Sequence, residues 1–91
     1  MGLIAKHIIF TGQVQGIGFR FTAFGAASRH KLNGFVRNLR DGSVEMLVQG
    51  NSADVDNCVR EIEESFAGYI TETKTEVVPF SPQFKNFKIT Y

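Results

Sequence analysis

Apolar residues follow two different spacings in the first third of the chain. The segment from Ile4 to Thr11 is rich in β-branched and aromatic residues and stops at Gly12, which is typical of a strand. Residues 20–32 follow a glycine-rich turn and contain three alanines, which favour a helix. This helix is expected to stop at Asn33-Gly34. The residues at helical spacing within it are Phe21, Phe24, Ser28 and Leu32.

The middle of the chain predicts a β-hairpin and a second helix. Residues 34–38 form a short apolar segment, Asp41-Gly42 is a strong hairpin signal, and residues 43–50 alternate apolar and polar side chains. A helix is expected over residues 53–66, capped by Asn51 or Ser52. Its apolar stripe consists of Val55, Cys58, Val59, Ile62 and Phe66.

The last third of the chain predicts strands alone. Residues 69–80 alternate threonines with charged residues, as a strand at a sheet edge does, and residues 84–91 predict a closing strand. The element order is therefore strand, helix, strand, strand, helix, strand, with one extra strand. This order predicts an α+β chain with a ferredoxin-like βαββαβ sandwich, in which two helices pack on one face of a mostly antiparallel sheet.

The composition narrows the class of protein. A length of 91 residues predicts a single domain over residues 1–91. With 43% hydrophobic and 21% charged residues the chain resembles ordinary soluble proteins, and a net charge of +1 argues against a dedicated nucleic-acid or membrane binder. The nine phenylalanines are expected to be mostly core residues. Cys58 has no partner for an internal disulfide and is expected to be a buried, inert thiol, which fits a cytoplasmic location.

The stretch GQVQGIGFRF, residues 12–21, carries the first candidate chemistry. Three glycines precede Arg20 where a strand is expected to lead into a helix. The amides at the start of a helix have no intrahelical acceptor, and glycines let the backbone approach a ligand, so this turn predicts an anion site. Arg20 has the wrong charge for the helix dipole, and a bound phosphate would reverse that balance.

The common phosphate motifs do not fit this turn. A P-loop requires Lys followed by Ser or Thr after the last glycine, and Phe19-Arg20 stands there instead. The pattern GxGxxG is also absent. From the turn alone, a glycine-rich connection with a surface arginine remains an equally open interpretation.

A second motif changes this balance. Residues 12–20 match the pattern Gly-x-Val-Gln-Gly-Val-x-Phe-Arg except that Ile17 replaces the valine. Residues 34–50 match a second pattern, with Asn38 in its fifth position and glycines at both ends. With both patterns the chain resembles the acylphosphatases over essentially its whole length, and residues 66–84 alone carry no matching motif.

The resemblance implies hydrolysis of acyl phosphates to a carboxylate and inorganic phosphate, without metal or cofactor. It assigns Arg20 to phosphate binding and Asn38 to positioning the attacking water. The phosphate-binding loop that it implies comprises Gln15, Gly16, Ile17, Gly18 and Phe19. Its implied partners are a small acyl phosphate, with inorganic phosphate or sulfate as inhibitor; a monomer without nucleic-acid or membrane partners is expected.

This chemistry agrees with the residues. A carboxylate leaves without needing a proton. A loose phosphoryl-transfer transition state is reached mainly by positioning the reactants and by stabilising the charge on the phosphate oxygens. No general acid is therefore required near Arg20. His7, His30 and Cys58 are too scattered to predict a metal site, and the acidic residues 61–65 predict a solvated helix face.

Three alternatives remain open at this point. An RNA-recognition module shares the element order, but it would stack bases on strand aromatics and would usually show a basic patch. A domain of a larger carbamoyl-phosphate-using maturation factor would typically have proline after the arginine, so Phe21 and the length of 91 residues favour a stand-alone enzyme. A phosphate-binding module without turnover would not need Asn38.

Overall fold

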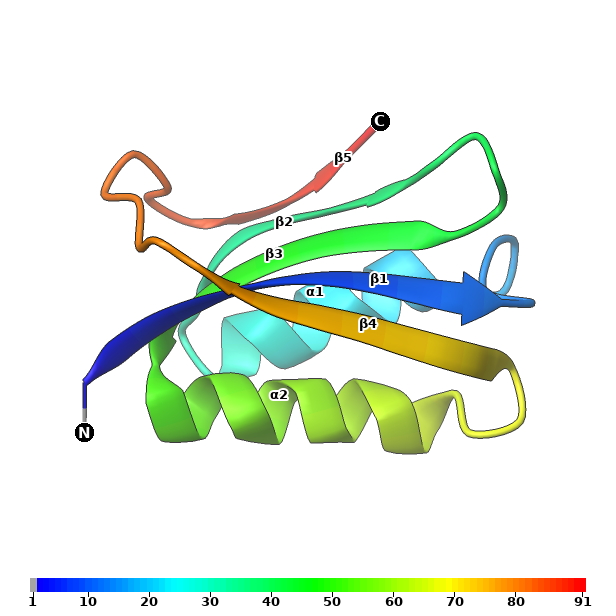
Figure 1. Cartoon of the computed structure of the whole chain (residues 1–91), viewed down its shortest axis with the longest axis horizontal. Helices are drawn as coiled ribbons and strands as arrows, with labels where there is room; N and C mark the ends of the chain where they lie inside the picture. The colour runs from blue at the N-terminus through cyan, green and yellow to red at the C-terminus, as the bar shows by residue number, and fades with distance from the viewer. Residues whose placement is uncertain (1) are drawn as a thin grey trace.

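The computed structural model describes residues 2–91, and the predicted element order is confirmed (Figure 1). Two helices and five strands follow one another along these described residues. Their bounds are β1 Leu3–Gly12, α1 Phe19–Arg29, β2 Asn33–Asn38, β3 Val44–Asn51, α2 Ser52–Ser65, β4 Ile70–Val78 and β5 Phe87–Thr90.

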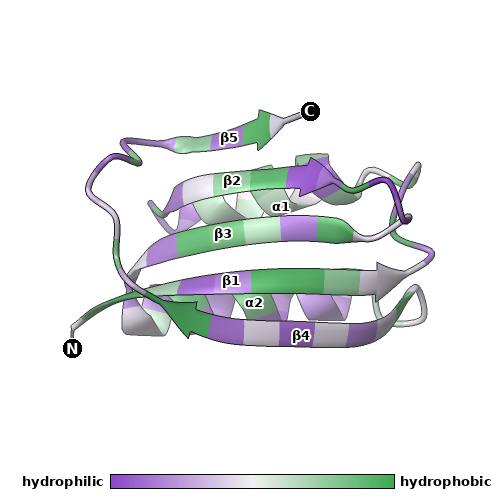
Figure 2. Cartoon of the chain, turned by 45° about the horizontal axis from the view of Figure 1, so that its top comes forward, coloured by the Kyte–Doolittle hydropathy of each residue, from purple (hydrophilic) through white to green (hydrophobic). Residues whose placement is uncertain are grey.

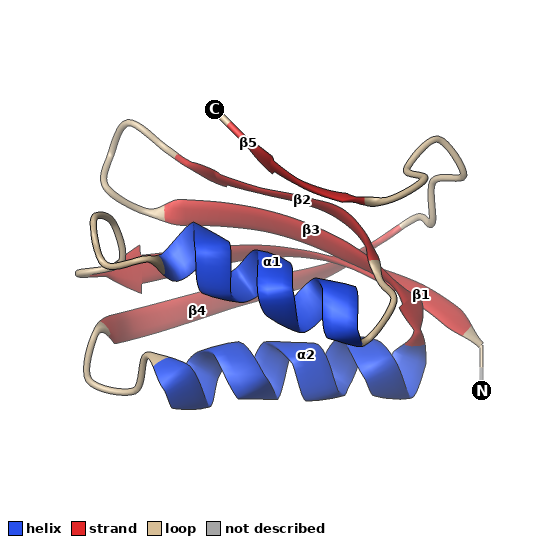
Figure 3. Ribbon diagram, turned by 180° about the vertical axis from the view of Figure 1, so that it is seen from behind, coloured by secondary structure: helices blue, strands red, loops and turns tan. Residues whose placement is uncertain are grey.

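The strands form one sheet in the order β4-β1-β3-β2-β5. Every neighbouring pair is antiparallel except β2 and β5, which run parallel with Val36 opposite Ile89. Both helices lie on one face of this sheet, and the other face is free of helices (Figure 3). The predicted ferredoxin-like architecture is therefore confirmed, with β5 as the additional edge strand.

The core lies between the helices and the alternate residues of the central strands. Ile8 and Phe10 of β1 and Met46 of β3 are completely buried, and so are Val55 and Ile62 of α2. The central strands carry the apolar residues, whereas β4 is largely hydrophilic or neutral (Figure 2). The predicted alternation in β3 and the predicted stripe of α2 are both confirmed, because they match the periods of a strand and a helix.

The packing face predicted for α1 is wrong. Phe21 is 75% exposed and Phe24 36% exposed, and the buried residues of α1 are Phe19, Ala23, Ala26 and Ala27. The small alanine side chains form the buried face of α1 where it contacts α2, β2 and β5, and the two phenylalanines lie outside that face. Four of the nine phenylalanines are buried, so the expectation that most are core residues is also wrong.

The end of α1 also differs from the prediction. The helix ends at Arg29, and Lys31 adopts a left-handed conformation with φ 58°. Asn33 and Gly34 already belong to β2. Gly34 has φ 138°, and a Cβ there would lie 1.9 Å from the carbonyl oxygen of Leu47, so this glycine permits β2 to approach β3.

The β4–β5 connection is fixed to the face of the sheet that the helices leave open. Gln49 of β3 is 1% exposed although its side chain lies on the face of the sheet that points away from the helices and the core. Its side-chain amide donates to the carbonyl of Ser81 at 2.6 Å, and the amide N–H of Ser81 donates back to Gln49 Oε1 at 3.1 Å.

Within residues 2–91, neither helix has the length and apolar character needed to cross a membrane.

Candidate functional site

The glycine-rich turn joins β1 to the first residue of α1. Gly16 and Gly18 both have φ 80°, and a Cβ at either position would meet no atom within 4 Å. A side chain would therefore have room at both positions, and crowding is not the reason for glycine there. A side chain would strain the left-handed backbone, and that backbone aims the turn into the helix.

The amides at the start of α1 have no acceptor among residues 2–91. The first helical hydrogen bond runs from the amide N–H of Thr22 to the carbonyl of Gly18 at 3.0 Å, so the amides of residues 19–21 precede it. Gly18 caps the helix without a side-chain hydrogen bond, and no acidic residue occupies the first turn. An anion placed here would meet free N–H groups and the positive end of the helix dipole.

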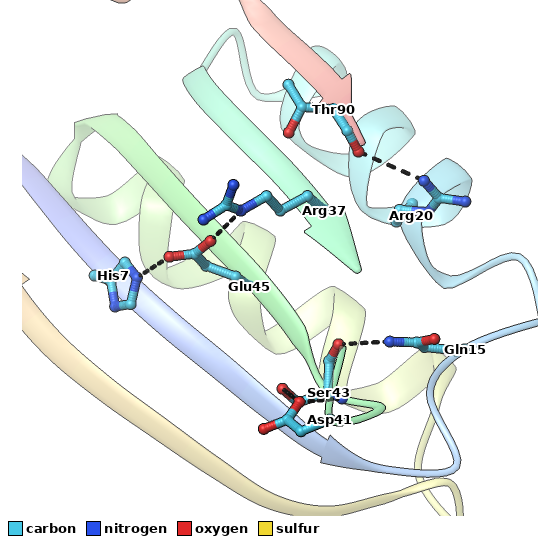
Figure 4. Close-up of polar contacts among 8 residues, drawn as sticks. All are labelled: His7, Gln15, Arg20, Arg37, Asp41, Ser43, Glu45 and Thr90. Carbon is cyan, nitrogen blue, oxygen red and sulfur yellow. Dashed lines mark hydrogen bonds and ion pairs between the residues drawn. The ribbon is translucent and has the colours of Figure 1, made fainter. Parts of the chain in front are cut away.

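Arg20 adds a full positive charge to this position. Its side chain is half-buried, its guanidinium lies 4.9 Å from the ring centroid of Tyr91, and its Nη1 lies 3.5 Å from the carbonyl oxygen of Thr90 (Figure 4). No carboxylate forms an ion pair with Arg20 among residues 2–91. The two contacts orient the guanidinium without neutralising it.

Asn38 is the last residue of β2, paired with Val44 of β3. It is half-buried, and alternation along β2 places it on the same face as Val36, toward the helices. Its side-chain amide forms no hydrogen bond with another group in the described part of the chain. A polar group so placed is available for water or a ligand.

One cavity brings Arg20 and Asn38 together, as the sequence predicts. It has a volume of about 270 Å³ and lies at the start of α1, between the glycine-rich turn, the end of β2 and the end of β5. Its lining residues are Val14, Gly16, Gly18, Phe19, Arg20, Phe21, Asn38, Ile89 and Tyr91. Sequence reasoning did not assign Val14, Phe21, Ile89 or Tyr91 to the site. Ile89 and Tyr91 are two positions apart and so share one face of an extended chain, but the sequence does not show which cavity they line.

Two residues of the predicted loop lie outside the cavity lining. Ile17 is 38% exposed. The Gln15 side chain instead donates one hydrogen bond to the carbonyl oxygen of Leu39 at 2.7 Å. It donates a second one to the carbonyl oxygen of Ser43 at 2.9 Å (Figure 4). These bonds join the glycine-rich turn to the hairpin that follows Asn38.

The same hairpin is ordered by its own turn. Asp41 accepts hydrogen bonds from the amide and the hydroxyl of Ser43, and these bonds lower the pKa of the Asp41 carboxyl. Gly42 takes φ 95°, in agreement with the predicted Asp41-Gly42 turn. The carbonyls that receive Gln15 thus belong to a well-defined turn.

The titratable clusters of the protein lie away from this cavity. Glu45 contacts His7 at 2.7 Å and also pairs with Arg37. Burial raises the pKa of Glu45, but the hydrogen bonds from His7 and Arg37 outweigh this effect and lower it. On the helical side, hydrogen bonds from His30 and then Arg29 lower the pKa of Glu61.

No metal centre can be built from the residues that the structure describes. Between residues 2 and 91, no three His, Cys, Asp or Glu side chains are placed so that they could hold one metal ion together. Cys58 is completely buried, as predicted, and burial, with a smaller effect of Glu61, raises the pKa of its thiol to about 12. A thiol held in this state is a poor nucleophile and metal ligand.

Comparison with known proteins places the chain among the acylphosphatases. The family model described as Acylphosphatase matches residues 6–89. An acylphosphatase of Bifidobacterium longum is 48% identical over 60 residues, which are 66% of this chain and 62% of that protein. An acylphosphatase of Chlorobaculum tepidum is 38% identical over 84 residues, 91% of each chain. The crystal structure of acylphosphatase from Bacillus subtilis has a TM-score of 0.87 at 28% identity and covers 97% of this chain and 99% of that one.

Proposed function

The chain belongs to the acylphosphatase family and is a hydrolase of acyl phosphates, and we propose that Arg20 and Asn38 perform this reaction in the cavity at the start of α1. The observation that carries the assignment is that both residues line one cavity together with the glycines of the turn. In the described chain, no carboxylate neutralises Arg20 and no hydrogen bond engages the side chain of Asn38.

The phosphate group is held by the turn and by Arg20. The amides of residues 16–20 lie at the positive end of α1 and are suited to the phosphate oxygens. The guanidinium of Arg20 pairs with two of these oxygens and balances the charge that spreads over them in the transition state. Gln15 is a positioning residue here, because its side chain holds the turn against the hairpin rather than facing the ligand.

Asn38 orients the attacking water. Its amide oxygen accepts one hydrogen bond from water, which aims a lone pair at phosphorus opposite the leaving carboxylate. An amide does not take up the proton, so the proton passes to an oxygen of the substrate phosphate. The leaving group departs as a carboxylate and needs no acid, and this agrees with a cavity lined by no acidic residue and no histidine.

The products are one carboxylate and one inorganic phosphate, and the phosphate occupies the same amides as the substrate. Inorganic phosphate and sulfate should therefore compete with substrate. We further infer a monomer acting in the cytoplasm on a small acyl phosphate, with neither nucleic acid nor membrane as a partner. The single buried Cys58 supports a reducing compartment.

Release of inorganic phosphate from benzoyl phosphate by the purified protein tests this assignment. We expect turnover by the parent protein, with separate defects in Arg20→Gln and Asn38→Ala. A folded parent protein without turnover would leave a phosphate-binding module as the function. Parental turnover in both variants would place the reaction elsewhere.

A further inference from the structure

A second cavity lies on the face of the sheet that the helices leave open. It has a volume of about 520 Å³ and is formed by β2, β5 and the connection that precedes β5. The lining residues are Gly34, Phe35, Arg37, Gln83, Phe84, Lys85, Asn86, Lys88 and Thr90. Binding sites for small organic molecules typically measure about 300–1,000 Å³.

The charge of this second cavity has one sign. Arg37, Lys85 and Lys88 line it, and no acidic residue does. Arg37 shares the carboxylate of Glu45 with His7, whereas Lys85 and Lys88 form no ion pair with any residue from 2 to 91. A ligand that complements this wall carries more than one negative charge.

The remaining lining favours a flat ring beside those charges. The rings of Phe35 and Phe84 lie with centroids 6.0 Å apart at 45°, and both are only partly buried. Gln83 and Asn86 expose side-chain amides next to them, and neither amide bonds to another described side chain. Aromatic faces stack on nucleobases, and amides match the donor and acceptor edges of a base.

The connection that carries these residues is held in place without a ligand. Two hydrogen bonds join Ser81 to Gln49, which is buried in β3, and the amide of Gly34 donates to the carbonyl of Asn86 at 2.9 Å. Both ends of the segment that supplies Gln83, Phe84 and Lys85 are therefore fixed to the sheet. The cavity is preformed, which reduces the entropy that a ligand must lose on binding.

We propose that this second cavity binds a free nucleotide carrying several phosphates. The phosphates pair with Lys85, Lys88 and the outer side of Arg37, and the base stacks on Phe35 and Phe84. The site is separate from the catalytic one, because Lys88 and Thr90 face it while Ile89 and Tyr91 line the cavity of Arg20. The two cavities thus use opposite sides of β5.

Calorimetric titration of the Arg20→Gln protein with ATP tests the proposal, because this background removes the competing phosphate site. One saturable site is expected. Lys88→Gln and Lys85→Gln should each weaken ATP binding about fivefold, and Phe84→Ala about tenfold, in line with the loss of one stacked ring. Lys74 is an exposed residue of β4 on the same face of the sheet as the second cavity, and Lys74→Gln should leave the affinity for ATP unchanged.

Two further titrants separate the halves of the ligand. Tripolyphosphate and adenosine should each bind at least tenfold more weakly than ATP. Tripolyphosphate binding as tightly as ATP, with no effect of Phe84→Ala, would reduce the site to a charged surface and overturn the proposal. Absence of saturable ATP binding would also overturn the proposal, and so would equal effects of Lys74→Gln and Lys88→Gln on ATP affinity. The turnover of benzoyl phosphate by the parent protein is independent of all these outcomes.

Discussion

Gln15 and Leu39 are joined by a 2.7 Å hydrogen bond from the side-chain amide of one to the main-chain carbonyl of the other. Leu39 directly follows Asn38, and Gln15 directly precedes the first glycine of the cavity wall. The bond therefore sets the distance between the turn that holds phosphate and the residue that holds water. The second bond of Gln15, to the carbonyl of Ser43, makes this connection resistant to rotation of the side chain.

Replacing Gln15 with Ala should lower both stability and catalysis. The carbonyls of Leu39 and Ser43 each keep a main-chain donor and lose the second donor that Gln15 supplies, and the loss of these two hydrogen bonds costs about 1–3 kcal/mol in the free energy of unfolding. The turn also becomes free to move relative to Asn38, so kcat should fall more than the affinity for inorganic phosphate. Urea unfolding and steady-state kinetics measure the two effects. Gln13 is an exposed glutamine two residues earlier, and its side chain forms no hydrogen bond within residues 2–91. Gln13→Ala should therefore match the parent in unfolding free energy and in kcat. Equal losses in the Gln13 and Gln15 variants would contradict the role of Gln15.

Replacing Arg20 with Gln should remove most phosphate affinity. One partner of a desolvated charge pair is lost, which costs about 2–5 kcal/mol in kcat/KM, chiefly as a raised KM. Inorganic phosphate should raise the melting temperature of the parent protein, since it binds the folded turn alone, and should not raise that of the variant. Arg60→Gln on the exposed side of α2 is the matched control. Equal phosphate stabilisation in the Arg20 variant and the parent would locate the anion elsewhere.

Replacing Asn38 with Ala should affect turnover rather than binding. A lost preorganised polar group lowers kcat by about 10²–10³-fold, while the inhibition constant of phosphate stays near the parental value. The fold should survive, because the side-chain amide of Asn38 bonds to no described residue. Asn57→Ala on α2 controls for the loss of an amide. A defect confined to KM would make Asn38 another phosphate ligand.

Activity should persist in a metal chelator and in histidine variants. Residues 2–91 hold no cluster of metal-ligating side chains, His7 pairs with Glu45 away from the cavity, and His30 pairs with Glu61. Dialysis against EDTA, His7→Gln and His30→Gln should each leave kcat within about twofold of the parent, because the mechanism uses no general base. Loss of turnover on chelation that zinc or magnesium restores would require a different mechanism.

Acid should destabilise the protein partly through Glu45. The pKa of its carboxyl is lower in the folded protein than the ordinary value of 4.5, so the folded state gains stability from it above that pH. This gain is lost as the pH falls below 4.5 and through the lowered pKa. Urea unfolding between pH 7 and pH 3 should show a shallower acid slope for Glu45→Gln than for the parent. Glu63→Gln, an exposed residue of α2, should keep the parental slope; an unchanged slope in Glu45→Gln would refute the assignment.

The sequence predicted those parts of the molecule in which a local pattern decides the outcome. The strands, the stripe of α2 and the Asp41-Gly42 turn follow from short-range periodicity and backbone preference. The orientation of α1 does not, because its buried face consists of three alanines and Phe19, while Phe21 and Phe24 lie outside that face. A scale that ranks side chains by hydrophobicity selects the wrong face in such a helix.

The candidate site divides in the same way. The glycines, Arg20 and Asn38 lie in two recognisable motifs, and the structure brings them together in one cavity. The direction of the Gln15 side chain could not be predicted, because it depends on carbonyls 24 and 28 positions away. The wall formed by Ile89 and Tyr91 depends in turn on the parallel pairing of β5 with β2.

This parallel pairing also sets the order in which the enzyme is completed during folding. Arg20 and Thr90 lie 70 positions apart in the chain, and their contact forms only when β5 pairs with β2 at the edge of the sheet. Helices and hairpins assemble from neighbours in sequence, whereas contacts of such separation cost more loop entropy and form slowly. Until β5 docks, the cavity of Arg20 lacks the side formed by Ile89 and Tyr91. Recovery of catalysis after dilution from denaturant therefore requires the docking of β5 in addition to the formation of the helices.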